Sequence, residues 1–201
     1  MSLAAVLEPT ATPGSALSGA DLTAEVAMRW ACTPARWSTT VRHVEGERWY
    51  LPLFEDEHVC GWLITWAPGT SLDLHDHGGA VGSLAVVGGT LTERFRDRRR
   101  VEPFATRELT AGSMVTFGAD HVHEVTNLGT EPAVSIHVYA PSLSGMTFYE
   151  EDPHAAAIRP TRAETVERAR AMSTRATSTR VPVPSTPQPT ALTTAFLNGF
   201  R

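Results

Sequence analysis

The sequence predicts an all-β fold preceded by a helical segment. Between residues 48 and 150, short runs rich in β-branched and aromatic residues alternate with Gly and Pro turns. A spacing of roughly 8–12 residues between such runs is typical of a sandwich or barrel. The runs read RWYLPLF, GWLITWA, SLAVVGG, TLTERFR, SMVTFG and AVSIHVY. We therefore expect one β-barrel domain over residues 46–150.

Residues 1–45 are expected to form an N-terminal arm and helices that pack on the barrel. Asp21 is a candidate helix N-cap, and the helix should end before Pro34. Residues 36–45 fit either a short helix or a strand. The helix is predicted from apolar residues at a spacing of four, namely Leu22, Val26 and Trp30.

Residues 151–201 are expected to form a partly disordered C-terminal extension. Residues 161–172 carry a charge pattern that suits a surface helix. Residues 173–190 are rich in Ser, Thr and Pro, a composition that favours disorder. The final ALTTAFLNGFR fits either a docking helix or a tail.

The composition limits the classes of function. The chain has 201 residues, of which 42% are hydrophobic, and its formal net charge of −5 comes without a concentrated basic patch, which argues against nucleic acid as a partner. The run Arg96–Arg100 fits a solvated loop tip between strands. No stretch approaches a membrane-spanning length. With two cysteines and no apparent signal peptide, the expected location is cytoplasmic, as a monomer or small homo-oligomer.

A pair of histidines is the first candidate site. On a strand, residues two apart point to the same face, so His75 and His77 present two imidazoles side by side, with Asp76 facing away. Imidazole binds Fe, Zn, Cu or Ni. His123 is the preferred third ligand, and His121, of the same parity, is the alternative.

The context of these histidines resembles the cupin superfamily. Gly69 followed after five residues by His75-Asp76-His77 resembles its first motif, and His123 with Asn127 resembles the second. Many cupins add a glutamate ligand four or five residues after the second histidine, where this chain has Val81 and Gly82. The implied site therefore has three neutral histidines, no carboxylate and an uncompensated ionic charge that attracts a thiolate.

A later strand carries three polar groups on one face. Ser135, His137 and Tyr139 alternate with aliphatic residues, and each can both donate and accept a hydrogen bond. An outward-facing edge strand is the ordinary interpretation of such a pattern. A hydrogen-bond relay is the functional one, and His and Tyr favour it.

Together these segments resemble thiol dioxygenases of the cysteine dioxygenase type, over roughly residues 48–148. The resemblance implies iron(II) on His75, His77 and His123, with O2 and a small thiol as substrates. It also implies that Ser135, His137 and Tyr139 form the relay. In animal members a cysteine is cross-linked to the tyrosine. Here Gly82 corresponds to that cysteine, which implies the uncross-linked bacterial branch.

The substrate site departs from the family pattern. In cysteine-oxidising members an arginine near the start of the barrel binds the substrate carboxylate, and the alignment places Leu51 there. The candidate substrate-binding residues are therefore Leu51, Trp49 and Arg48, with Arg94 and Arg107 as further cations. Because leucine cannot pair with a carboxylate, we expect a thiol other than free cysteine.

The sequence thus predicts a cupin barrel with an N-terminal helical extension that acts as an iron(II) thiol dioxygenase and forms a sulfinic acid. Two alternatives stay open at this point. One is another metal-dependent cupin activity, and the other is a cupin that binds a small ligand without catalysis.

Overall fold

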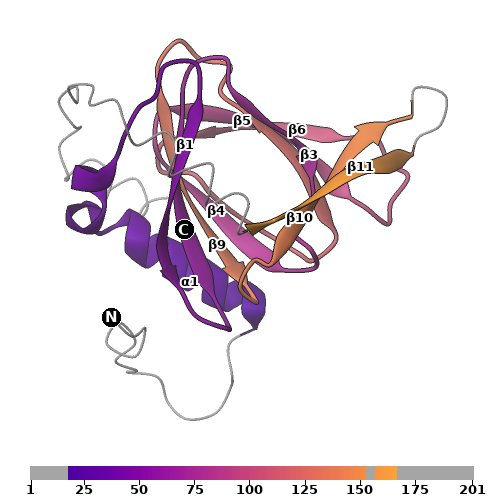
Figure 1. Cartoon of the computed structure of the whole chain (residues 1–201), viewed down its shortest axis with the longest axis horizontal. Coiled ribbons are helices and arrows are strands. Elements are labelled where there is room, and N and C mark those ends of the chain that lie inside the picture. Colours follow the sequence, from indigo (N-terminus) through magenta and orange to yellow (C-terminus); the bar gives the residue numbers. More distant parts are fainter. Residues whose placement is uncertain (1–17, 153–156, 167–201) are drawn as a thin grey trace.

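A computed structural model describes residues 18–152 and 157–166 of the chain (Figure 1). Its strands form two antiparallel sheets, with the orders β1-β2-β9-β4-β7 and β11-β10-β3-β8-β5-β6. The strands are β1 (Arg48–Glu55), β2 (Cys60–Trp66), β3 (Ser71–His75), β4 (Val81–Gly88), β5 (Thr90–Asp97), β6 (Ala105–Thr110), β7 (Met114–Phe117), β8 (His121–Thr126), β9 (Ala133–Ala140), β10 (Gly145–Glu151) and β11 (Ile158–Thr165). The expected all-β barrel is confirmed.

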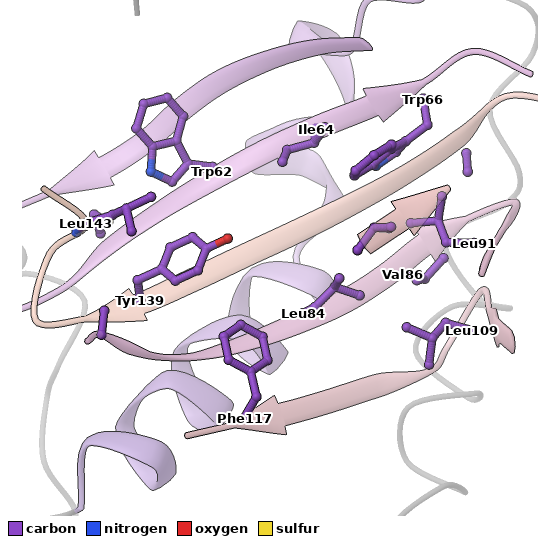
Figure 2. Packing of buried hydrophobic residues seen from close by; sticks show 14 of the residues in the cluster. Trp62, Ile64, Trp66, Leu84, Val86, Leu91, Leu109, Phe117, Tyr139 and Leu143 are labelled. Atoms are coloured by element: carbon purple, nitrogen blue, oxygen red, sulfur yellow. Dashed lines mark hydrogen bonds between the residues drawn. The ribbon is translucent and has the colours of Figure 1, made fainter. Parts of the chain in front are cut away.

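The core consists of two hydrophobic clusters on opposite faces of the first sheet. The inner cluster lies between the sheets and includes Trp66 from β2, Leu84 from β4 and Leu91 from β5 (Figure 2). The outer cluster includes Leu63 and Ile136 and meets the N-terminal helix. Because both faces of the first sheet are covered, every residue of β2 is buried.

Helix α1 (Gly19–Ala31) covers the outer face of the first sheet (Figure 1). Its buried residues recur about every four positions, namely Thr23, Val26, Ala27 and Ala31. The expected N-cap, Asp21, is wrong. Ser18 caps the helix by accepting a hydrogen bond from the Asp21 backbone N–H, because only a residue before the first turn can reach those amides. No helix among the described residues is long and apolar enough to cross a bilayer.

The segment after α1 contains two short 3₁₀ helices, η2 (Pro34–Arg36) and η3 (Ser38–Thr40). They turn the chain toward the start of β1, and Trp37 between them is buried in the outer cluster. Its indole N–H donates to the Trp30 carbonyl at 2.8 Å, which ties this turn to the end of α1.

The C-terminal part of the barrel corrects one prediction. Residues 161–165 were expected to begin a surface helix, but they lie in β11, which pairs with β10 and extends the second sheet. The expected boundary at residue 150 accordingly falls inside β10. Because β11 is an edge strand, it tolerates Pro160, which has no backbone N–H to donate. Its open edge also faces solvent, which suits its exposed charged residues. Expectations for residues 1–17 and for 167–201 lie outside the described residues.

Candidate metal centre

Three histidines converge at one end of the barrel interior. His75 closes β3 and pairs in register with His123 on β8, while His77 lies two residues beyond the end of β3. One ring nitrogen from each lies within 4.8 Å of the others, and Nε2 of His77 is 3.2 Å from Nε2 of His123. All three side chains are buried. His121 contacts Glu93 instead of His75 or His77.

The hydrogen bonds of these histidines orient their free nitrogens. Nδ1 of His75 donates to the Asp73 carbonyl at 2.7 Å, and Nδ1 of His123 donates to the Glu93 carboxylate at 2.7 Å. Each Nε2 therefore keeps its lone pair. Burial, reinforced by the neighbouring histidines, lowers the pKa of His75 and His77, and burial also lowers the pKa of His123. Neutral imidazoles are the form that binds a metal.

This donor set fits a divalent transition metal. Two ligand nitrogens that share one ion at ~2.1 Å and meet at a right angle lie about 3 Å apart. The 3.2 Å between the Nε2 atoms of His77 and His123 is close to that value. Nδ1 of His77 is buried without a hydrogen-bond partner among the described residues, so only Nε2 of that ring is directed at the cluster by a contact.

Asp76, between the two histidines of β3 and its extension, fixes their backbone. It is buried on the opposite side from the cluster, as the alternation of side chains predicts. Its carboxylate accepts hydrogen bonds from the backbone N–H groups of Gly78 and Thr147, the Tyr149 hydroxyl and the Arg98 guanidinium. The arginine-rich loop tip after β5 is therefore not merely solvated, because Arg98 reaches back to this carboxylate.

A buried carboxylate missed by the sequence analysis stands behind His123. Glu93 on β5 is 0% exposed and also contacts His121 and Arg107. Burial alone would raise its pKa, but hydrogen bonds from His121, His123 and Arg107 hold the pKa well below its usual range. The expected ligand set of three histidines stays a prediction, and Glu93 adds an anion one hydrogen bond away from His123. The sequence did contain a signal for this burial: Glu93 is two residues from Leu91 on one strand, so both side chains point to the same face.

The polar face of β9 forms a continuous hydrogen-bond chain. The Ser135 hydroxyl lies 2.8 Å from Nε2 of His137, whose Nδ1 lies 3.2 Å from the Tyr139 hydroxyl. All three residues are buried, which excludes the outward-facing interpretation. Trp66, which the sequence analysis did not include, begins the chain by donating its indole N–H to Ser135 at 2.9 Å.

Trp66 fixes the direction of the first bond in this chain, because an indole can only donate, and the tautomer of His137 fixes the other two. Ser135 accepts from Trp66 and keeps its own proton, which it can donate to Nε2 of His137. In the tautomer that accepts from Ser135, His137 carries its proton on Nδ1 and donates to Tyr139. Burial lowers the pKa of His137 to about 3, so the ring is neutral, and burial raises the pKa of Tyr139. The phenolic proton of Tyr139 is left to point into the cavity.

A cavity of about 560 Å³ opens from these groups. His75 and His123 line it together with the last two members of the relay, His137 and Tyr139. Most of its remaining wall is apolar, and comprises Tyr50, Trp62, Ile64, Trp66, Leu72, Val125, Leu143, Met146, Phe148 and Val166. Charged residues also contribute, namely Glu47, Arg48, Asp73, Arg162 and Glu164.

Strand β1 places Arg48, not Leu51, in this cavity. Leu51 packs against the outer cluster and does not line the cavity, so its assignment as a substrate-binding residue is wrong. Trp49 touches the cavity but is buried in the outer cluster. Because successive side chains alternate between faces, the parity opposite to Leu51 turns Arg48 inward. Its guanidinium carbon lies 5.4 Å from the Trp66 ring centroid.

The charge of Arg48 is not matched by a close partner. Within residues 18–152 and 157–166, no carboxylate lies within 4.0 Å of its guanidinium, and burial lowers its pKa. The other candidate cations are engaged elsewhere: Arg94 pairs with Glu124 and Glu151, and Arg107 pairs with Glu93.

Gly82 leaves the space beside Tyr139 to an aromatic ring. The two residues are register partners on β4 and β9. A Cβ atom at Gly82 would lie 2.6 Å from the Phe117 ring and 3.0 Å from the Tyr139 ring. Glycine has no sulfur to offer Tyr139, and Phe117 occupies the position into which a longer side chain would extend.

The antiparallel barrel and its buried histidine cluster define a metal-dependent enzyme of the cupin class. A model of one family, described as cysteine dioxygenase type I, matches residues 24–152. The chain therefore belongs to the cysteine dioxygenase type I family.

Several solved structures have a similar chain trace. One is an uncharacterized conserved protein with a double-stranded β-helix domain from Klebsiella pneumoniae, with 22% identity, a TM-score of 0.45, and coverage of 54% of this chain and 90% of the other. Another is a cupin superfamily protein from Desulfitobacterium hafniense, with 14% identity, a TM-score of 0.45, and coverage of 52% and 87%. A recombinant oxalate oxidase in complex with glycolate has 17% identity, a TM-score of 0.48, and coverage of 54% and 60%.

Proposed function

We propose that the protein is a cytoplasmic iron(II)-dependent thiol dioxygenase, which converts a small thiol that carries a carboxylate, together with O2, into a sulfinic acid. The observation that supports this most directly is the joint placement of three groups around one cavity. His75 and His123 line this cavity together with Tyr139 and Arg48, and the Tyr139 ring centroid lies 4.9 Å from that of His77. Both cysteines of the chain are free, which suits a reducing compartment.

Arg48 is the proposed carboxylate-binding residue. A carboxylate that leaves water needs a cation or several hydrogen bonds, and the planar guanidinium can match both of its oxygens. Asp73 and Glu164 act on Arg48 only through longer-range charge attraction, and no ion pair joins Arg48 to a carboxylate of the described residues, so a ligand carboxylate can pair with it directly. The expectation of a thiol other than free cysteine rested on Leu51, and that reason no longer holds. Cysteine and 3-mercaptopropionate are both substrates of the proposed class.

His75, His77 and His123 would hold the iron through ring nitrogens. When bound, iron(II) supplies the coordination of thiolate and O2 and the exchange of electrons between them. The protein itself contributes orientation: the carboxylate is fixed at Arg48, so the thiol end of a short substrate is directed toward the histidines. The apolar wall keeps water away from the reacting sulfur.

Tyr139 is the proposed hydrogen-bond donor to the reacting atoms. Its oxygen accepts from His137, so its own proton is available to the substrate sulfur or to oxygen. Burial keeps the phenol protonated. Ser135 and Trp66 act through His137, because they hold the ring in the tautomer that donates to Tyr139.

The proposed reaction balances without a further reductant. The S–H and O–O bonds break, two S–O bonds form, and the C–S bond stays intact. Sulfur loses four electrons, and O2 takes up the same four. The proton of the thiol ends in water, because the sulfinic acid product ionises to a sulfinate.

The test measures O2 uptake and sulfinate formation by the iron-loaded protein with cysteine, 3-mercaptopropionate and cysteamine. We expect one O2 consumed per thiol, and loss of both iron and activity in His75→Ala. His58→Ala serves as the matched control, because this histidine is exposed and belongs to neither group of candidate ligands among the described residues. Stoichiometric iron without uptake of O2 with any thiol would contradict the proposal. Activity that survives in His75→Ala would contradict the ligand assignment.

A further inference from the structure

Glu93 is a fully buried carboxylate within the barrel. It lies on β5 with its side chain on the same face as buried Leu91. A buried anion is costly unless it is paired and fully hydrogen-bonded. Oε2 of Glu93 accepts from Nε of Arg107 at 2.6 Å, and the two residues are register partners on β5 and β6. One oxygen is therefore neutralised by a guanidinium.

The other oxygen of Glu93 contacts two histidines. Oε1 accepts from Nδ1 of His123 at 2.7 Å and lies 2.9 Å from Nε2 of His121. An ionised carboxylate can only accept, so Nδ1 of His123 must carry the proton and Nε2 must face the cluster. A carboxylate bound to the far nitrogen of a metal-binding imidazole also raises the electron donation of that ring.

From this geometry, and resting on the proposed function, we propose that Glu93 and Arg107 form a charge pair that sets the donor strength of His123. The carboxylate draws the Nδ1 proton toward itself and gives the ring partial imidazolate character. That change favours metal binding and stabilises the oxidised, more highly charged metal. Arg107 acts in the opposite sense, because its positive charge withdraws electron density from the same carboxylate. Glu93 is thus a positioning residue with an electronic effect, and Arg107 moderates it.

The pairing with Arg107 also argues against Glu93 as a direct ligand. Glu93, His121 and His123 form a second group whose ligand atoms lie within 4.8 Å of one another. A guanidinium already occupies one carboxylate oxygen, and the two histidines share the other. The His75–His77–His123 group faces the cavity, with two of its members in the cavity wall. The charge pair therefore lies behind the centre and not in it.

The experiment compares two variants with opposite expected signs. Glu93→Gln keeps an acceptor for His123 but removes the charge. We expect the metal dissociation constant to rise about 10- to 100-fold and the midpoint reduction potential of the iron protein to become more positive. Arg107→Gln removes the moderating charge, so the potential should become more negative. Arg94→Gln, a neighbour on β5 that pairs with Glu124 and Glu151, is the control and should leave the potential unchanged.

The signs separate this proposal from a structural role. If Glu93 only supported packing, both variants would lower the melting temperature of the metal-free protein without opposite shifts of the potential. If the potentials of the two variants shift in the same direction, or not at all, the inference is overturned. The proposed function is unaffected in that case as long as His75→Ala still loses the metal. Should Glu93→Gln fail to fold, Arg107→Gln alone decides, because its side chain is 32% exposed and the negative shift is required. Metal retained in His75→Ala but lost in His121→Ala would overturn the proposed ligand set and this inference with it.

Discussion

Replacement of Arg48 by glutamine should lower kcat/KM for thiols that carry a carboxylate and leave kcat/KM for other thiols nearly unchanged. The substitution removes the positive charge from the cavity wall and leaves a polar side chain of similar length. Because β1 turns this residue inward and no carboxylate of residues 18–152 or 157–166 forms an ion pair with it, the lost interaction is the proposed one with the substrate.

The magnitude follows from the surroundings of the guanidinium. Removing one partner of a buried, hydrogen-bonded charge pair costs about 2–5 kcal/mol. Arg48 is half-buried and lies over the Trp66 ring, so the low end of that range applies. A loss of about 2–3 kcal/mol corresponds to a fall in kcat/KM of roughly 30- to 150-fold for cysteine and 3-mercaptopropionate. Cysteamine has no carboxylate and should change less than about threefold.

The assay is steady-state O2 uptake by iron-loaded protein with the three thiols. Arg162→Gln is the matched control, because this second cavity-lining arginine already pairs with Asp73 and Glu164. It should affect all three thiols by the same small factor. An equal loss for cysteamine and cysteine in Arg48→Gln would refute the assignment, as would a carboxylate-selective loss in Arg162→Gln with none in Arg48→Gln.

Three further predictions concern the relay and its surroundings. Tyr139→Phe should keep its iron but lower kcat about 10²-fold, since one hydrogen bond to the reacting atoms is lost, and an unchanged kcat would remove Tyr139 from the mechanism. Gly82→Ala should lower the free energy of unfolding by about 1–3 kcal/mol in chemical denaturation, because its Cβ would crowd Phe117, whereas Gly118→Ala meets no atom within 4 Å and should change it by less than ~0.5 kcal/mol. The pKa of His137 falls from 6.5 to about 3 on folding, so the unfolded chain takes up the proton first and the metal-free protein loses stability as the pH falls through that interval. His137→Leu should make this pH dependence shallower, and an identical dependence in both proteins would contradict the assignment.

The parts of the site that were predictable lie on single strands. Ser135, His137 and Tyr139 share a face because they are two residues apart on β9, and strand periodicity alone places them together. The two histidines of the first motif follow the same rule, although β3 ends at His75. The family resemblance then supplied the third histidine, which no local rule could link to the other two.

The parts that were missed depend on contacts between strands. Glu93 appears in TLTERFR as an ordinary charged residue, and its partner Arg107 becomes a neighbour only when β5 and β6 pair. The indole N–H of Trp66 on β2 donates to Ser135 on the neighbouring strand β9, a contact that exists only once the two strands pair. Arg48 was among the candidate substrate-binding residues, but the resemblance gave Leu51 the position of the family's arginine; because the two residues differ by an odd number, only one of them can face the cavity, and that one is Arg48.

The C-terminal strand was missed because local charge spacing was taken as helical. Residues 158–165 have an open sheet edge to pair with at β10, and that tertiary pairing outweighs local preference. Pro160 lies at the register shift opposite Tyr149, where a missing backbone donor costs little.

On a strand of the first sheet, residues on one face shape the cavity wall, and residues on the other face support the packing of α1. On β2, the even positions Trp62, Ile64 and Trp66 belong to the cluster that borders the cavity, whereas Leu63 belongs to the cluster under α1. Substitutions at the even positions of β2 can therefore change the cavity wall, while the outer cluster, which packs against α1, keeps its composition. A library randomised at Trp62 and Ile64 samples that route directly, and one randomised at Leu63 and Ile136 samples fold stability instead.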